Sequence, residues 1–238
     1  SDIKAIGFTG SRAGGRALMD AAAARPEPIP VFAEMSSVNP IFILPGAMAE
    51  RGEAIAQGLV GSVTLGAGQF CTCPGLVFGN VSETFESTLK SGFSEITPAT
   101  MLHSGIHQNF VKGLTNLQSQ DGVGTIEQVE SKEANKAGAA ILKASASQFI
   151  NNPKLNEEIF GPSSLVIDCS SRDEMLAAAL KLEGQLTATI HGTDEELSEA
   201  GDLVQILEQK AGRVIINSFP TGVEVNSSMV HGGPYPAT

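Results

Sequence analysis

The first 34 residues follow a strand–helix–strand order, and this order restricts the fold more than any other feature of the chain. Residues 3–8 and 29–34 read as strands, and residues 12–24 between them have the apolar spacing of a helix. A helix that links two strands of one sheet makes those strands parallel, with a right-handed crossover. We therefore expect an α/β protein with a mostly parallel sheet.

The same alternation continues along the chain. The residue pattern predicts further strands and helices, and it indicates a polar, exposed segment at 130–140. Strands are expected at 41–44, 76–78, 165–168, 186–191 and 214–217, and helices at 47–65, 172–182 and 194–209, with 81–118 helical but interrupted.

Composition excludes several classes of partner. The chain has 238 residues, 42% of them hydrophobic, which is enough for a sizeable core. Its net charge of −11 disfavours nucleic acid and anionic membranes as partners. No apolar run approaches the roughly 18 residues of a membrane-spanning helix. Three cysteines form no even disulfide framework, so we expect a reducing, cytoplasmic compartment.

A cysteine-containing turn rich in glycine is the first candidate for chemistry. Residues 66–74 read Gly-Ala-Gly-Gln-Phe-Cys-Thr-Cys-Pro, and they follow the helical run. Glycine-rich backbone lets a substrate reach the Cys71 sulfur and lets N–H groups meet a developing oxyanion. The alternative is an inert core cysteine. Cys73 is too close in sequence for an unstrained bridge, and no second Cys/His pair stands nearby, so no metal site is expected.

Two further candidates lie in the first 34 residues. Glu34 ends a strand, where ligands bind in parallel sheets, and its apolar neighbours could raise its pKa enough for a general base. The alternative is a glutamate facing solvent. Gly10 and Ser11 form a strand-to-helix turn that suits a diphosphate. Here the alternative is a tight turn with Ser11 as the helix N-cap.

Three more candidates lie in the second half. Glu158 could hold ribose hydroxyls and Phe160 could pack on a ring, although residues 156–162 also read as an ordinary loop. His231 stands in a glycine-rich loop and is the most interesting of the four histidines. The remaining three read as surface or structural residues: His103, His107 and His191.

Together these motifs resemble the aldehyde dehydrogenase superfamily along nearly the whole chain. Residues 32–40 are similar to the branch of NADP-dependent aldehyde dehydrogenases and 2-oxoglutarate semialdehyde (2,5-dioxovalerate) dehydrogenases. The motifs that carry the resemblance, in order, are Phe8-Thr9-Gly10-Ser11, then Glu34, then Gly68-Gln69-Phe70-Cys71, then Glu157-Glu158-Ile159-Phe160-Gly161-Pro162, then Gly212-Arg213-Val214-Ile215-Ile216-Asn217.

The resemblance implies a fold and a division into domains. It implies a three-layer catalytic domain like that of aldehyde dehydrogenases over residues 36–238. Residues 1–35 would be the C-terminal edge of a dinucleotide-binding domain. The family's chains are longer, so we expect this chain to be a fragment that lacks the N-terminal half.

The resemblance also implies roles for single residues. Cys71 would be the nucleophile, forming a thiohemiacetal and then a thioester, and its backbone N–H would donate to the oxyanion. Glu34 would activate water, and His231 is hypothesised to polarise substrate or water. On the cofactor side, Glu158 and Phe160 would contact the nicotinamide riboside, with Gly10 and Ser11 near the diphosphate.

The implied reaction oxidises an aldehyde, in particular a semialdehyde, with NADP, or alternatively NAD, in a homo-oligomeric enzyme. Two other interpretations stay open. The chain could be a non-catalytic domain fragment, or a cofactor-independent cysteine esterase or acyl transferase. Cys73 would be either a spectator or a trap for oxidised Cys71.

Overall fold

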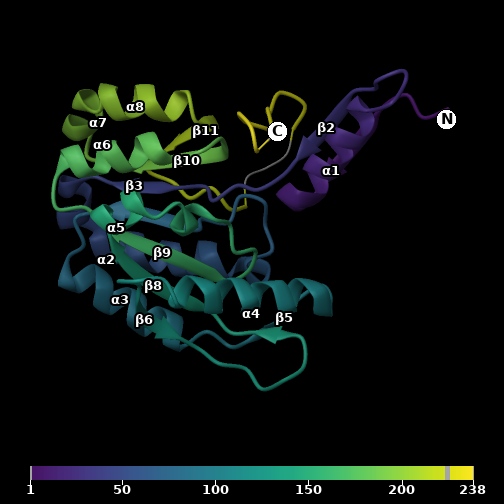
Figure 1. Ribbon diagram of the computed structural model, residues 1–238. Coiled ribbons are helices and arrows are strands. Elements are labelled where there is room, and N and C mark those ends of the chain that lie inside the picture. Colours follow the sequence, from purple (N-terminus) through teal and green to yellow (C-terminus); the bar gives the residue numbers. More distant parts are fainter. Residues whose placement is uncertain (1, 223–225, 238) are drawn as a thin grey trace.

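A seven-stranded sheet forms the centre of the computed structural model, which describes residues 2–222 and 226–237 (Figure 1). Its strands are β3 (Ile41–Ile43), β4 (Leu76–Gly79), β6 (Gly124–Gln128), β8 (Ala140–Ser145), β9 (Ser163–Asp168), β10 (Gln185–His191) and β11 (Ala211–Ile216). Their order is β11-β10-β3-β4-β9-β8-β6, and every neighbouring pair is parallel except β6 with β8. The prediction of a mostly parallel α/β fold is therefore confirmed.

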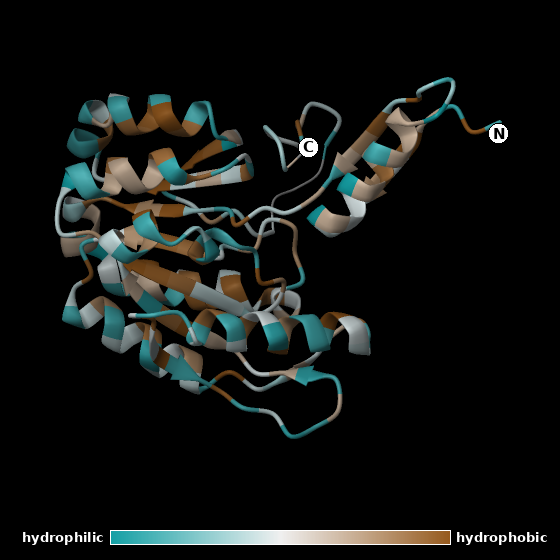
Figure 2. Ribbon diagram, in the orientation of Figure 1, coloured by the Kyte–Doolittle hydropathy of each residue, from teal (hydrophilic) through white to brown (hydrophobic). Residues whose placement is uncertain are grey.

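Helices cover both faces of this sheet and complete three layers. On one face lie α2 (Pro45–Thr64) and α3 (Glu83–Ser94); on the other lie α4 (Ser104–Gln118), α5 (Ala146–Asn151), α6 (Arg172–Lys181) and α8 (Gly201–Glu208), with α7 (Asp194–Glu199) leading into α8. Successive strand residues point to opposite faces. Accordingly Ile41 and Ile43 pack with α2 and α3, whereas Phe42 packs with the other layer and stacks on Phe78. Figure 2 shows the apolar strands between helices with hydrophilic outer surfaces.

The N-terminal strand–helix–strand unit forms a separate parallel sheet. It consists of β1 (Ile6–Thr9), α1 (Arg12–Ala23) and β2 (Val31–Glu34), and it projects from the main body in Figure 1. The Ser11 side chain accepts a hydrogen bond from the Gly14 N–H at 3.2 Å, so Ser11 does cap α1. The domain boundary after residue 35 stays a prediction.

The structure corrects the prediction for the end of the segment 130–140: residues 132–134 are exposed, as predicted, but residues 137–140 are buried. Ala137, Ala139 and Ala140 are buried, where an exposed polar segment was expected. They lead into β8, which lies between β9 and β6; its first three residues are buried and show no alternation, whereas Lys143 and Ser145 are exposed. The sequence pattern also missed β6 and α5, and the helix expected at 194–209 breaks at Ala200 into α7 and α8.

Two short features complete the described part of the chain. The strands β5 (Ala99–Thr100) and β7 (Lys136–Ala137) form a small antiparallel pair, and two 3-10 segments, η1 (Leu65–Gly68) and η2 (Pro153–Asn156), lie in loops. Among the described residues no helix has the length and apolar character needed to cross a membrane.

Three loops meet at the amino edge of the sheet. Residues 35–40 lead into β3, residues 69–75 into β4, and residues 157–162 into β9. Because β3, β4 and β9 are parallel neighbours, their starts lie side by side. The first of these loops comes directly from β2, so the carboxyl end of β2 faces the amino ends of the central strands.

The buried side chain of Asn39 ties these loops together. It is fully buried and adopts a left-handed φ of 45°. Its amide donates to the carbonyl oxygens of Cys71 at 2.8 Å and Cys73 at 3.0 Å. Its oxygen accepts from the Ser37 and Thr187 hydroxyls. One side chain thus joins the loop before β3, the loop before β4, and β10.

We predict that Asn39→Ala lowers the free energy of unfolding by about 2–4 kcal/mol, because it leaves buried carbonyl groups without donors. Urea unfolding followed by circular dichroism measures this. Asn39→Gly tolerates the positive φ, so the difference between the two variants isolates backbone strain from lost hydrogen bonds. The exposed Asn116→Ala on α4 is the control, with a change of about 0.5 kcal/mol or less. An Asn39→Ala variant as stable as this control would contradict the assignment.

Candidate active site

The backbone before Cys71 has three successive residues in the left-handed conformation. Gly66, Ala67 and Gly68 have φ values of 57°, 57° and 65°, which lie in the left-handed region that favours glycine. A Cβ atom on Gly68 would lie 2.2 Å from the backbone carbon of Gly161, so no side chain fits there. The cysteine loop therefore packs directly against the turn that follows Glu158.

Three of the predicted residues converge on one point. The Cys71 Sγ lies 3.3 Å from the His231 Nε2, and this nitrogen lies 3.4 Å from the Glu34 Oε2. All three atoms are within 4.8 Å of one another. The Glu34 side chain is 19% exposed and that of His231 31%, so the cluster is recessed but reachable. We call Glu34, Cys71 and His231 the thiol cluster.

The Cys71 sulfur and the Glu34 carboxylate both contact the same ring nitrogen of His231, Nε2. A neutral imidazole nitrogen either carries a proton or accepts one. The Nε2 atom can thus accept from the Cys71 thiol or donate to the Glu34 carboxylate, but it cannot do both at once. This arrangement provides a path for a proton between sulfur and carboxylate through a single atom.

The electrostatics of Cys71 keep its sulfur protonated at rest. Burial raises the pKa of the Cys71 thiol, and the charge of Glu34 raises it further. The backbone N–H groups of Cys71 and Thr72 and the charge of Arg213 oppose this increase without cancelling it. A thiol of this kind needs a base to become a nucleophile, and the imidazole of His231 is in contact with it.

Glu158 has a carboxyl group that titrates near neutral pH. Burial raises its pKa to about 7, and the nearby charge of Glu34 adds to the effect. Hydrogen bonds from the Ser36 side chain and the Ser37 backbone act in the opposite direction. Glu158 therefore lies close to the thiol cluster, and its charge changes within the physiological range.

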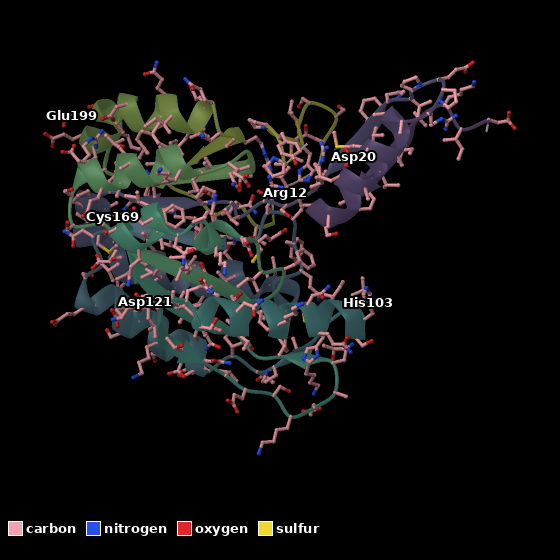
Figure 3. The ribbon with its side chains drawn as sticks, in the orientation of Figure 1. Arg12, Asp20, His103, Asp121, Cys169 and Glu199 are labelled. Atoms are coloured by element: carbon pink, nitrogen blue, oxygen red, sulfur yellow. The ribbon has the colours of Figure 1, made fainter. Side chains whose placement is uncertain are left out.

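A groove of about 720 Å³ runs beside Glu158, between the N-terminal unit and the main body. Ser36, Gln185 and Pro236 are among its lining residues, together with Arg12 from α1. Figure 3 shows Arg12 in the space between α1 and the main body. Its guanidinium pairs with Glu183 at 2.6 Å, which links the two parts across a mostly exposed contact.

The other predicted ligand-binding residues lie around this region. The Gly10 N–H donates to the Glu34 backbone oxygen at 3.1 Å, so the turn before α1 adjoins the end of β2. Ser11 follows it as the N-cap of α1. Phe160 is 36% exposed and lines a smaller cavity together with Glu158.

The remaining cysteines point away from the thiol cluster. The Cys73 Sγ is directed at the Val63 carbonyl at 3.6 Å, and burial, with the charge of Glu158, raises its pKa to about 12. This geometry favours the spectator interpretation of Cys73 over the trap. Cys169 is buried after β9, at the opposite edge of the sheet (Figure 3).

Sequence reasoning missed three residues of the site. Asn39 and Ser36 belong to the loop between β2 and β3. The small polar residues of this loop, just before Pro40, were the sequence feature that could have indicated their role. Arg213 stands in a quoted motif but was given no role. Two of its guanidinium nitrogens are buried without a partner among the described residues, and the third contacts the Met229 sulfur at 3.2 Å.

Comparison with curated proteins gives two relatives that cover 99% of this chain. The alpha-ketoglutaric semialdehyde dehydrogenase 2 of Azospirillum brasilense is 45% identical over 240 residues, which make up 46% of its own length. The alpha-ketoglutaric semialdehyde dehydrogenase of Acinetobacter baylyi is 44% identical over 241 residues, again 46% of its length. The chain thus spans about half the length of the curated relatives that it matches.

Solved structures show the same fold. An aldehyde dehydrogenase from Bacillus cereus superposes with a TM-score of 0.79 at 20% identity, covering 98% of this chain and 47% of that one. The family described as "Aldehyde dehydrogenase family" matches residues 1–234. The chain therefore belongs to the aldehyde dehydrogenase family.

Proposed function

We propose that the protein oxidises an aldehyde to a carboxylic acid, with Cys71 as nucleophile and a nicotinamide dinucleotide as hydride acceptor. The observation that carries this proposal is the convergence of a thiol, an imidazole and a carboxylate within 4.8 Å, in a member of the aldehyde dehydrogenase family. The names of the two relatives support a semialdehyde that bears a 2-oxo acid as substrate.

The first half of the proposed reaction uses the shared nitrogen of His231. The thiol proton of Cys71 moves to Nε2 over the 3.3 Å contact, and the sulfur attacks the aldehyde carbon to form a thiohemiacetal. The N–H groups of Cys71 and Thr72 lie beside the sulfur and are available to the developing oxyanion. A bound nicotinamide dinucleotide would supply the hydride acceptor; with hydride lost from this carbon, Cys71 would be left holding a thioester.

The second half uses Glu34 as general base. Its carboxylate takes a proton from a water molecule, and the resulting hydroxide attacks the thioester carbon. The carbon–sulfur bond then breaks, the acid leaves, and the sulfur regains a proton. The proton that Nε2 of His231 took from the thiol in the first half returns to the sulfur over the same contact, and the proton that Glu34 gained from water leaves to solvent.

The groove beside Glu158 fits the proposed cofactor. It contains a partly buried carboxyl group able to accept from ribose hydroxyls, and it lies between the main body and the α1 unit. Phe160 would lie against the nicotinamide riboside, with Gly10 and Ser11 near the diphosphate at the start of α1. We propose NADP as the cofactor, with NAD as the alternative, because residues 32–40 resemble the NADP-dependent branch.

We also propose a cytoplasmic, homo-oligomeric enzyme. The three cysteines are free thiols, which fits a reducing compartment. The homo-oligomer is inferred from family membership alone.

A second candidate function is acyl transfer or ester hydrolysis without a cofactor. It is favoured by the fact that the thiol cluster lies entirely within this chain. Parallel assays for nicotinamide reduction and for p-nitrophenyl acetate hydrolysis separate the candidates. Hydrolysis alone supports the second candidate, and the absence of both activities supports a non-catalytic domain.

We predict that Cys71→Ser lowers kcat for semialdehyde oxidation by roughly 10³-fold or more, because a hydroxyl is a much weaker nucleophile at neutral pH. Absorbance of the reduced nicotinamide measures this. Cys73→Ser is the matched control two residues away and keeps kcat within about twofold. Equal loss in both variants would contradict the assignment of the nucleophile.

We predict that His231→Gln lowers kcat by about 10²-fold while KM changes little, because glutamine retains polarity but cannot carry the proton. Steady-state kinetics of the purified variant give both constants. His107→Gln on α4 tests for a general effect of losing a histidine. Unchanged kcat and KM in His231→Gln would remove the proposed proton transfer.

We predict that cofactor binding tightens about 5- to 10-fold as the pH rises from about 6 to about 8, because ionised carboxylates accept stronger hydrogen bonds. The sign follows from the Glu158 pKa of about 7: the carboxyl is mostly protonated below this pH and mostly ionised above it. Titration calorimetry at several pH values measures the effect. Glu158→Gln should bind with the same affinity throughout, whereas the exposed Glu157→Gln keeps the slope; a slope that persists in Glu158→Gln would assign it to another group.

A further inference from the structure

The thiol cluster carries the donor set of a zinc site. It offers one sulfur from Cys71, one imidazole nitrogen from His231 and one carboxylate oxygen from Glu34, with all three atoms within 4.8 Å. We propose that this cluster binds Zn²⁺ and that the bound ion reversibly inhibits the enzyme. Glu34, Cys71 and His231 lie far apart in sequence, so no short metal-binding motif in the sequence indicates this site.

The distances between the donor atoms agree with tetrahedral zinc. Bonds of about 2.3 Å to sulfur and about 2.0–2.1 Å to nitrogen or oxygen place tetrahedral ligand atoms roughly 3.3–3.6 Å apart. The sulfur–nitrogen distance is 3.3 Å and the nitrogen–oxygen distance is 3.4 Å. The sulfur–oxygen distance is below 4.8 Å, so a carboxylate movement of about 1 Å or less brings this pair to the tetrahedral spacing as well.

The chemistry of the donors selects the metal. Thiolate and imidazole ligands favour Zn²⁺ over Mg²⁺ and Ca²⁺, which prefer oxygen. Two anionic ligands balance the charge of the ion. Nearby, the carboxyl of Glu158 adds negative charge as it ionises, and Arg213 acts in the opposite sense. Three protein ligands leave a fourth position for water, so the cluster can take up the ion from solution.

Metal binding and catalysis exclude each other at this site. Coordination releases the thiol proton of Cys71 to solvent and occupies the sulfur lone pair that would attack an aldehyde. It also engages the Nε2 of His231 and the carboxylate of Glu34. The inhibition rests on the proposed function, whereas the binding itself does not.

Optical titration with Co²⁺ tests the binding independently of activity. A tetrahedral cobalt site with a thiolate ligand shows sulfur-to-metal charge transfer in the near ultraviolet together with visible bands, and Zn²⁺ abolishes both by displacement. We expect one equivalent per chain. Cys71→Ser should lose the charge-transfer band, and His231→Gln and Glu34→Gln should each bind Zn²⁺ at least about tenfold more weakly.

Cys73→Ser is the matched control and should keep the full cobalt spectrum, since its Sγ points at Val63. Circular dichroism confirms that each variant is folded. A band that survives Cys71→Ser, or equal Zn²⁺ affinity in the wild type, His231→Gln and Glu34→Gln, would overturn the site. Metal binding in a protein without dehydrogenase activity would refute the proposed function alone; an active protein without the cobalt band would refute the zinc site alone.

Discussion

The amide of Asn39 is the interaction on which the arrangement of the site depends. It is completely buried, and it pairs with two backbone carbonyls of the cysteine loop and with hydroxyls from its own loop and β10. In a dry interior, each of these groups would be costly to leave unpaired. Asn39 therefore ties the loop that presents Cys71 to the sheet, together with the hydrogen bond from the Gly75 N–H to the Val38 oxygen.

The site draws its groups from opposite kinds of strand end. Glu34 stands at the carboxyl end of β2, whereas Cys71 and Glu158 stand on loops that enter β4 and β9 at their amino ends. His231 comes from a third source, the C-terminal segment. Since the N-terminal unit and the main body are separate sheets, their relative placement decides whether carboxylate and thiol meet. The ion pair between Arg12 and Glu183 is one contact that links the N-terminal unit to the main body.

Local patterns in the sequence were enough for most of the fold. Helix α1 with its Ser11 cap, helix α2 and the central strands follow from apolar spacing and turn residues. Strand β8 did not, because its buried residues 140–142 form only a short apolar run and the alternation after them covers just three residues, 143–145. Its antiparallel neighbour β6 is short and mixed in character.

For the site, the sequence indicated individual residues but not which of them are in contact. Glu34, Cys71 and His231 were each singled out for their surroundings, but they are separated by long stretches of chain, and only the tertiary fold brings them to one nitrogen. Asn39 escaped notice for a related reason. Three of the five described hydrogen-bond partners of its side chain are backbone carbonyls. Every residue has a backbone carbonyl, so residue types cannot predict these contacts.

The raised pKa of Cys71 has a consequence for the chemical stability of its side chain. Peroxides and other oxidants react with thiolates far faster than with thiols. A sulfur that stays protonated at rest is therefore shielded from sulfenic and sulfinic acid formation, although it is reachable from solvent. In the proposed mechanism, the sulfur is reactive only while His231 holds its proton. The burial that makes the resting thiol a poor nucleophile thus also protects it from oxidation.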